Sequence, residues 1–375
     1  MRSARFWRVD VPGREVGPTQ IITRARCELE WQEPRGSEGP PGLAKLVLSD
    51  HIICAVASTW MLNCRSSVLQ LLACPQDHTR LRAEDDNLVC EQYHRFNVEE
   101  GIPILIENPR REPTPRNMEP CHIEPGASVD PFVNDWLVNT NGNLYWHVRG
   151  RLRRYPIPFW PTCIGEAKLL VDVGCGWGRW TIAAARAGFR PVGLDVHIDA
   201  LAAAIRVSRQ MDVRADYVCS NVDRLPFQSA SVDFVFSYSV LQHLEKSVAM
   251  RFFKEVSRVL KPKGVCLVQL PNVFGLHSML QQAKRGFREG RSGTFEMRYW
   301  STKAIRRAVE MAGLKDMAIR PEGFFTQNPQ LSDLDLLSPI GKLIVLVSNA
   351  GRKLAAIFPV VTGLADSLWV EAQVR

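Results

Sequence analysis

The sequence lacks an apolar run long enough to cross a membrane, and it lacks a secretory leader at its start. The nearest approach to a span is 45–61 (KLVLSDHIICAVASTWM), which carries Lys45, Asp50 and His51. It is shorter than the roughly 20 apolar residues that a spanning helix needs. The first ten residues mix arginine and aspartate, with no apolar core behind them. We therefore predict a cytoplasmic protein without a transmembrane segment.

The sequence also lacks a dense block of lysine and arginine, and its 10 cysteines are scattered. Several cysteines lie in apolar runs, such as Cys219 in ADYVCS and Cys266 in GVCLVQL. A reduced cysteine in such a run behaves as a small apolar residue, as expected in a reducing compartment. The net charge of +8 permits attraction to nucleic acid, anionic lipid or an acidic substrate, but it selects none of them.

Segments rich in proline and glycine divide the chain into parts. VPGREVGPT and EPRGSEGPPG predict a poorly ordered extension over 1–65, and Met61 is a candidate translation start. Short apolar runs alternate with turn residues over 66–108, which predicts a small β-rich module. Residues 109–134 are polar and rich in proline, which is typical of a linker.

The remaining part, 135–375, predicts an α/β domain. From residue 168 on, short apolar runs alternate with helical segments, which indicates a doubly wound parallel sheet with helices on both faces. Strands are predicted at KLLVDV, PVGLD, ADYVCS, SVDFVFS and GVCLVQL, at 316–320, and at 367–374 as an edge strand; helices are predicted at 178–188, 199–210, 246–260, 302–313 and 340–357. Core packing is the expected role of the apolar helix near 340–363, with membrane or partner contact as the alternative.

The aromatic and basic segment 135–160 predicts a helix that ends before Pro156. Two roles are open for Tyr145, Trp146 and His147: they cap a ligand of the following domain, or they bury their own helix in the core.

The strongest local signal is VDVGCGWGRW (171–180), a glycine-rich loop between a predicted strand and a predicted helix. Glycines allow a sharp turn and a close approach to a ligand beyond the carboxyl ends of the strands. Asp195 closes the next strand, where a carboxylate can accept hydrogen bonds from ribose hydroxyls. A dinucleotide site has G-x-G-x-x-G, but here Arg179 stands at the third glycine. Asp172, just before the loop, suits a ligand with a cationic amino-acid end.

Together with GLDV, NVDRLPFQSASVDFVFSYSVLQHL and EVSRVLKPKGVCLVQLPN, this loop resembles the successive motifs of class I S-adenosylmethionine-dependent methyltransferases. The match is closest to the small-molecule subgroup related to ubiquinone-biosynthesis methyltransferases. It is tight over 168–275 and looser over 135–375. The resemblance implies a Rossmann-like, seven-stranded methyltransferase sheet and S-adenosylmethionine as cofactor.

The resemblance also implies roles for individual residues. Asp172 would position the amino-acid end of the cofactor, Asp195 would bind its ribose, and Ser237 would approach its methionine part. Asn221, where many family members have aspartate, and Val222 would line the adenine. The remaining residues carried over belong to the same two loops: Gly174, Cys175, Gly176 and Gly178, and Val196.

Methyl transfer needs mainly proximity and alignment, so a missing triad or metal does not argue against it. His243 is the candidate base for the acceptor, because a neutral imidazole is present near pH 7; a structural role is the alternative. Tyr238 either shapes the acceptor pocket or belongs to the core.

The acceptor is less determined than the cofactor. No [DN]-P-P-[YF] tetrapeptide follows the fourth strand, which speaks against amino methylation of a flipped DNA base. We expect a small-molecule or saccharide acceptor. The alternatives are methylation of tRNA or rRNA and a non-catalytic scaffold that binds the cofactor.

The module sequence LLACPQDHTRL…LVCEQYHRFNVEEGIPILI resembles the zinc-ribbon-like activator subunit of some tRNA and protein methyltransferases. A full zinc ribbon has two C-x-x-C pairs, whereas here Asp77 and Tyr93 follow Cys74 and Cys90 at the second positions. We expect a metal-free module held by its apolar core. The alternative is a mixed site in which histidines four residues after each cysteine, His78 and His94, complete the ligand set.

Overall fold

The computed structural model describes residues 68–111, 129–163, 165–291 and 296–375. The predicted extension over 1–65, with the segment 45–61 and the candidate start at Met61, lies outside the described residues, as does most of the predicted linker. Within the described ranges, no helix combines the length and the apolar character that crossing a membrane requires.

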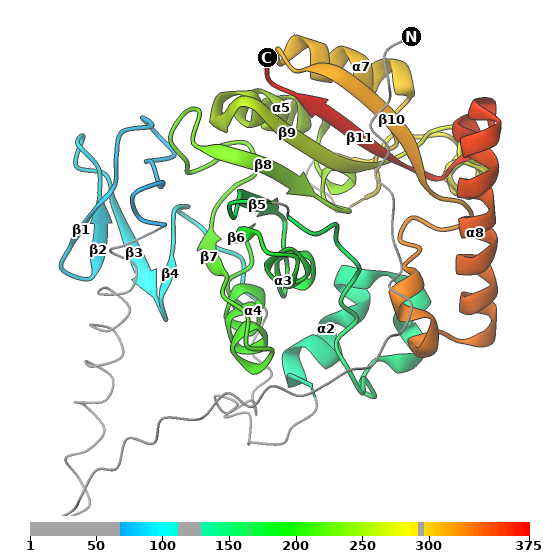
Figure 1. Cartoon of the computed structure of the whole chain (residues 1–375), viewed down its shortest axis with the longest axis horizontal. Helices are drawn as coiled ribbons and strands as arrows, with labels where there is room; N and C mark the ends of the chain where they lie inside the picture. Colours follow the sequence, from blue (N-terminus) through cyan, green and yellow to red (C-terminus); the bar gives the residue numbers. More distant parts are fainter. Residues whose placement is uncertain (1–67, 112–128, 164, 292–295) are drawn as a thin grey trace, which may run out of the picture. The chain divides into compact units, whose positions relative to one another are not determined.

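A seven-stranded sheet forms the centre of the larger domain, in the order β10-β11-β9-β8-β5-β6-β7 (Figure 1). β5 to β9 run parallel, while β11 is antiparallel to both of its neighbours. The strands are β5 (Leu169–Val173), β6 (Arg190–Asp195), β7 (Asp216–Cys219), β8 (Val232–Ser237), β9 (Leu260–Pro271), β10 (Lys315–Gly323) and β11 (Ser367–Gln373). The predicted doubly wound, Rossmann-like sheet is confirmed.

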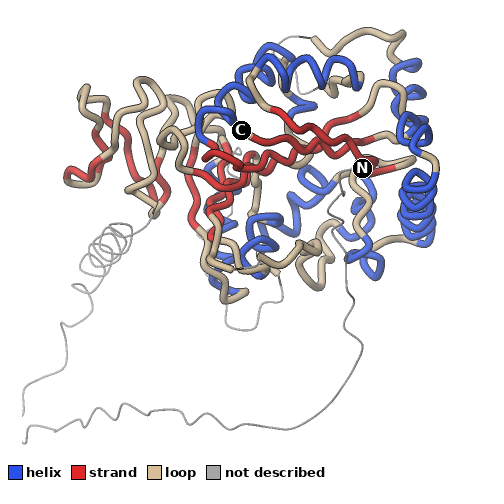
Figure 2. Tube along the Cα trace, turned by 45° about the horizontal axis from the view of Figure 1, so that its top comes forward, coloured by secondary structure: helices blue, strands red, loops and turns tan. Residues whose placement is uncertain are grey.

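Helices cover both faces of this sheet (Figure 2). On one face lie α3 (Arg179–Arg186) and α4 (Ile198–Gln210), and on the other lie α5 (Lys246–Val259) and α7 (Thr302–Met311). The buried residues of α5 recur at helical spacing, from Ala249 through Phe252, Phe253 and Val256 to Val259. Such a stripe must lie against an apolar surface, and the sheet supplies it.

The central strand β5 explains why the sheet forms where it does. All five of its residues are buried, as expected for a parallel strand with helices on both sides. The chain turns sharply out of β5 into α3 and returns in β6, so the carboxyl ends of both strands lie at the same edge. The strand order reverses between β5 and β8, which is where open α/β sheets bind ligands.

The last strand differs from its prediction. β11 was expected at the edge of the sheet, but it lies between β9 and β10, and β10 is the edge strand. Alternation of apolar and polar residues distinguishes the two faces of a strand, not its place in the sheet. Leu368, Val370 and Ala372 are buried, and that pattern is equally compatible with either position.

The predicted helix over the aromatic segment is also different. α2 (Pro131–Asn141) begins earlier, with Asp130 as its N-cap, and stops at Gly142, whose φ is 86°. A short 3-10 helix, η1 (Asn143–Val148), follows. Because a left-handed residue ends a regular helix, the glycine stops α2 well before Pro156.

The small module is a four-stranded antiparallel sheet: β1 (Arg82–Glu84), β2 (Asn87–Val89), β3 (Arg95–Glu99) and β4 (Ile102–Pro103). Directly after β4, Ile104 forms a parallel bridge with Cys219, the last residue of β7. The Leu105 amide donates to the Cys219 carbonyl at 2.8 Å. The module therefore covers the otherwise open edge of β7.

The helix α8 (Pro339–Ile357) contradicts the expectation of core packing. Its buried residues are Gly341, Val345, Ser348 and Ala355, whereas many of its larger apolar side chains are exposed. Ile340 is 73% exposed, and Val360 in the following η4 (Pro359–Leu364) is 84% exposed. The buried face of α8 is narrow: Val345 packs in an apolar cluster, and Gly351 lies against the ring of Phe324. The other short elements are η2 (Leu241–His243), α6 (Leu276–Lys284) and η3 (Leu331–Leu336).

Candidate active site

One cavity of about 1430 Å³ opens at the carboxyl ends of β5, β6 and β8. Nine of the twelve predicted site residues line it: Gly174, Cys175, Gly176, Asp195, Val196, Asn221, Val222, Tyr238 and His243. Asp172, Gly178 and Ser237 are not among the lining residues. The position agrees with the rule that ligands bind at the point where the strand order reverses.

The glycine loop forms one wall of the cavity. Gly174 and Gly176 have φ values of 79° and 53°, in the left-handed region that glycine adopts without strain. A Cβ atom on Gly174 would lie 2.2 Å from Cγ2 of Val240, so the loop backbone lies directly against a neighbouring lining residue. A larger residue at Gly174 would therefore displace Val240 or the loop.

Gly178 has a packing role. It is the N-cap of α3, with φ 83°. A Cβ atom there would lie 2.6 Å from the Tyr217 hydroxyl and 3.1 Å from the Ala204 side chain. The third glycine therefore allows the start of α3 to lie close against β7 and α4.

Asp195 connects the two loops of the site. Its Oδ2 accepts a hydrogen bond from the Gly176 amide at 2.8 Å, and its Oδ1 accepts one from the His197 amide at 3.0 Å. Burial raises the pKa of this carboxyl, while the backbone donors oppose the rise. Both oxygens keep lone pairs beyond these bonds, so the carboxylate can accept further donors from a ligand in the cavity.

Asp172 lies behind the loop. Its side chain is 1% exposed, and its Oδ2 accepts from the Thr181 hydroxyl of α3 at 2.6 Å. Burial raises the pKa of Asp172 to about 7. In this arrangement the carboxyl holds the loop against α3. Asp172 would therefore affect a bound ligand indirectly, by fixing the backbone of the glycine loop.

Two residues at the end of β8 have their side chains engaged within the protein. The Ser237 hydroxyl donates to the Val173 carbonyl at 2.9 Å, which joins β8 to β5. The Tyr238 hydroxyl donates to Glu322 Oε1 at 2.9 Å and accepts from Gln330 Nε2 at 3.0 Å. Burial raises the pKa of Tyr238, so the phenol stays neutral. Its side chain forms part of the cavity wall.

His243 closes the short helix η2 and is partly exposed to the cavity. Arg298 Nη1 donates to its backbone carbonyl at 3.2 Å, and the Arg298 amide donates to the Gln242 carbonyl at 2.8 Å. These bonds fix the backbone that carries the imidazole. His243 and Tyr238, the two candidate catalytic residues, both line the cavity.

The aromatic residues considered as a cap lie elsewhere. Tyr145 is buried, and Trp146 and His147 are exposed, but none of the three lines the cavity. The neighbouring residues Asn141 and Gly142, at the end of α2, do line it. The segment therefore contributes to the wall at the α2–η1 junction.

Sequence reasoning did not identify the opposite wall of the cavity. It comes from α2, η2, α6, the 325–328 segment and α8, and includes Gln242, Gln327 and Asn328. The side-chain oxygens of these three amides are buried and accept no hydrogen bond from the described residues. A buried acceptor that is left unsatisfied is costly, but these oxygens are closed to solvent, so a ligand in the cavity would reach them only after the side chains rotate. Single amides in loops give no sequence signal.

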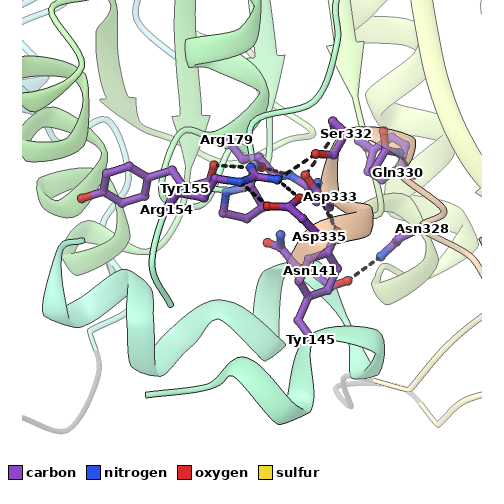
Figure 3. Close-up of polar contacts among 12 residues, drawn as sticks. Asn141, Tyr145, Arg154, Tyr155, Arg179, Asn328, Gln330, Ser332, Asp333 and Asp335 are labelled. Carbon is purple, nitrogen blue, oxygen red and sulfur yellow. Dashed lines mark hydrogen bonds and ion pairs between the residues drawn. The ribbon is translucent and has the colours of Figure 1, made fainter. Parts of the chain in front are cut away.

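Arg179 has an unpredicted role. It is the first residue of α3 and is 5% exposed, yet it lines the cavity. Its Nη2 forms an ion pair with Asp333 of η3, and the Tyr145 hydroxyl donates to the same carboxylate oxygen (Figure 3). Its Nε donates to the Pro156 carbonyl at 2.7 Å. The residue that replaces the third dinucleotide glycine thus connects three distant segments beneath the site.

The comparisons with known proteins agree with this geometry. Residues 170–264 match the family described as "Methyltransferase domain". The chain is 28% identical over 162 residues to the biotin biosynthesis bifunctional protein BioHC of Cellvibrio japonicus, covering 43% of this chain and 30% of that protein. It is 36% identical over 110 residues to a probable S-adenosylmethionine-dependent methyltransferase of Mycolicibacterium smegmatis, covering 29% and 40%.

Among solved structures, a SAM-dependent methyltransferase of Methanosarcina mazei matches with a TM-score of 0.40 and 18% identity, covering 56% of this chain and 94% of that one. The chain spans between 30% and 54% of the length of the first four curated relatives. The match to the methyltransferase family covers the segment from β5 to the start of β9, which carries the glycine loop and Asp195.

Proposed function

We propose that this chain is an S-adenosylmethionine-dependent methyltransferase that acts on a small-molecule or saccharide acceptor. The observation that carries the proposal is the large cavity that has the glycine loop on one side and the amide-rich wall on the other. Its volume of about 1430 Å³ exceeds the ~300–1,000 Å³ of an ordinary ligand pocket, so a cofactor and a second molecule fit together.

The residues at the loop end fit this cofactor. Gly174 and Gly176 line the cavity without side chains of their own, and Asp195 offers acceptor oxygens for ribose hydroxyls. Asn221 and Val222 lie at the same end and would border the adenine, as the resemblance implies. When bound, S-adenosylmethionine supplies a methyl group already activated on a sulfonium.

The protein then has to align the acceptor and manage its proton. Rotation of the Gln242, Gln327 and Asn328 side chains would present their unsatisfied amide oxygens to hydroxyl or amine donors of an acceptor. His243, on the same wall, would take the proton that a hydroxyl acceptor releases. Tyr238 would stay neutral and form a flat wall beside the reacting groups.

The small module would act within the same chain as an activator-like support. The segment after β4 joins the edge of β7, and the Arg110 amide then donates to the Val196 carbonyl at 2.7 Å. Arg110 and Arg111 line the cavity. The module therefore continues directly into the wall beside Asp195. The cytoplasm stays the predicted location of the protein.

Calorimetric titration with S-adenosylhomocysteine tests the cofactor site. We expect micromolar binding to the unaltered protein and about 100-fold weaker binding to Asp195→Ala, because the carboxylate supports both the loop and the ligand. Asp86→Ala, which removes an exposed carboxylate in the module, is the matched control and should bind as the unaltered chain does. Absence of binding to the folded, unaltered protein would contradict the cofactor site, and with it both the enzyme and the scaffold that binds the cofactor.

The acceptor class is tested by transfer of a labelled methyl group into fractionated cell extract. Label in the small-molecule fraction supports the proposal. The second candidate is RNA methylation, which the net charge of +8 and the cavity arginines Arg110, Arg111 and Arg285 favour. Label in the RNA fraction, with RNA affinity that falls steeply as salt rises, would replace the small-molecule acceptor with RNA.

A further inference from the structure

Four metal-ligating side chains converge in the small module, away from the cavity. Cys74 and Asp77 lie on the turn before β1, and Cys90 and His94 lie on the turn between β2 and β3. Each offers one ligand atom, and these atoms lie within 4.8 Å of one another. Both cysteines are fully buried.

The spacing of the four atoms matches one tetrahedral ion. With bonds of about 2.3 Å to sulfur and about 2.0–2.1 Å to nitrogen or oxygen, Zn²⁺ would separate its ligand atoms by about 3.3–3.8 Å. His94 Nδ1 lies 3.5 Å from Cys74 Sγ and 3.3 Å from Cys90 Sγ. Asp77 Oδ2 lies 3.2 Å from Cys90 Sγ and 3.0 Å from His94 Nδ1. Each observed distance is within a few tenths of an ångström of the tetrahedral value.

The groups around the cluster support ligation. The Gln76 amide points at Cys74 Sγ at 3.4 Å, and the His94 amide points at Cys90 Sγ at 3.3 Å. Such amides stabilise metal-bound thiolates. Thr79 donates to Asp77 Oδ1 through its amide at 2.9 Å and through its hydroxyl at 2.7 Å. One carboxylate oxygen is thereby held by the protein, while the other faces the cluster.

The two turns that carry the ligands have similar backbone conformations. The His78 amide donates to the Cys74 carbonyl at 2.9 Å, and the Tyr93 amide donates to the Cys90 carbonyl at 3.0 Å. His78 and Tyr93 have φ values of 61° and 63°, which ordinary residues seldom adopt. The two hydrogen bonds span four residues after Cys74 and three after Cys90, and each closes a turn that presents its ligands to the cluster.

We propose that Cys74, Asp77, Cys90 and His94 bind one structural Zn²⁺ ion. Two sulfur ligands favour Zn²⁺ over Mg²⁺ and Ca²⁺, which prefer oxygen. The donor set differs from the four thiolates of a zinc ribbon and from the Cys/His alternative drawn from the sequence. His78 is exposed and lies outside the cluster. Asp77 occupies the ligand position that the sequence alternative gave to His78.

The site would stabilise the junction between the module and the sheet. The Ala73 amide, directly before Cys74, donates to the Pro226 carbonyl at 2.9 Å, and Leu72 forms an antiparallel bridge with Phe227. A metal that ties the two turns together also holds this strand against the methyltransferase domain. Loss of the metal should therefore lower the thermal stability of the whole chain.

Metal analysis of the full chain, purified under reducing conditions, tests the proposal independently of methyl transfer. We expect about one Zn²⁺ per chain in the unaltered protein and under about 0.2 in Asp77→Asn and Cys90→Ser. His78→Asn is the matched control, because it changes a residue of the same turn that lies outside the cluster, and asparagine tolerates a left-handed φ. The control should keep its zinc.

Replacement of the ion by Co²⁺ in the unaltered protein gives a second readout that needs no variant. Two thiolate ligands should produce a sulfur-to-cobalt charge-transfer band and strong tetrahedral ligand-field bands. Asp77→Asn should keep its folded circular dichroism spectrum with a lower Tm. The proposal is overturned if the reduced, zinc-supplemented chain holds no metal, since the cluster is then a hydrogen-bonded network, or if Asp77→Asn and Cys90→Ser hold as much zinc as the control.

Discussion

At the loop end of the cavity, the lining residues come largely from the two adjacent turns between Gly174 and His197, whereas the opposite end draws on α2, α6, the 325–328 segment and α8. The loop end has local causes, because glycine φ values and one carboxylate determine its shape. The acceptor end depends on side chains that meet only after the domain has folded. Residues that lie close together in the chain form a motif that can be recognised in the sequence. A wall built from distant segments has no such motif.

The largest effect is expected from Gly174→Ala. The new Cβ would meet Val240 at 2.2 Å on a backbone with φ 79°, so the loop must move. We expect S-adenosylhomocysteine affinity to fall by at least about 100-fold in calorimetric titration. Gly165→Ala is the control, because its φ of 88° carries the same backbone strain with no atom within 4 Å. If both variants lose affinity equally, close approach at the loop is not the cause.

The next effect concerns the scaffold beneath the acceptor end. Arg179→Met leaves the buried carboxylate of Asp333 without its cation, which should lower the free energy of unfolding by about 3–5 kcal/mol. Denaturant unfolding followed by circular dichroism measures this. Arg154→Met breaks the exposed pair with Asp335 in the same network and should cost about 0–1 kcal/mol (Figure 3). Equal losses would show that burial does not distinguish the two pairs.

The third prediction concerns pH. Burial raises the pKa of Glu322 from 4.5 to about 7, against the opposing effect of Arg352 and of the hydrogen bonds from Tyr238 and Trp369. Between these values the folded chain holds a proton that the unfolded chain has lost. The stability that this carboxyl contributes is therefore fully present below pH 4.5 and is lost as pH rises to about 7, by about 3 kcal/mol in total.

Glu322→Gln should flatten the decline in the free energy of unfolding measured between pH 5 and pH 7.5. The glutamine amide has one acceptor oxygen fewer than the carboxyl group, so the variant should be less stable than the unaltered protein at pH 5. The quantity to compare is therefore the slope of the free energy of unfolding against pH. Asp172→Asn is the companion variant, because burial raises the pKa of Asp172 to about 7 as well. Asp172→Asn should remove the part of the pH dependence that Asp172 causes and leave the part that Glu322 causes. A slope unchanged in Glu322→Gln contradicts the assignment.

The smallest effect separates the two ends of the cavity directly. Asn221→Ala should weaken S-adenosylhomocysteine binding by about 5–10-fold, the value of one neutral hydrogen bond to the adenine. Asn328→Ala, at the acceptor end, should change that affinity by less than about 2-fold, because its amide oxygen lies with the acceptor wall. A reversed order of the two effects would place the cofactor at the other end.

Features that depend on neighbouring residues were predictable from the sequence, and features that depend on distant segments were not. The strands from β5 to β9 were predicted within a few residues, since buried parallel strands are apolar runs with turn residues at each end. β11 was misplaced at the edge because alternation does not report strand order. The apolar helix α8 was expected in the core, yet many of its large side chains are exposed. The prediction failed because hydropathy does not show which face of a helix packs against the rest of the protein. The roles assigned to single residues, His243 among them, stay predictions.

The sequence by itself determined the doubly wound sheet, the glycine loop and the position of Asp195, because each depends on residues within one strand–loop–helix unit. Only the tertiary structure decided that Arg179 reaches Asp333 and that Asp77, not His78, joins Cys74, Cys90 and His94. The physical reason is that ion pairs and ligand clusters depend on distances of a few ångströms between segments far apart in the chain, and these distances exist only after the apolar core has packed.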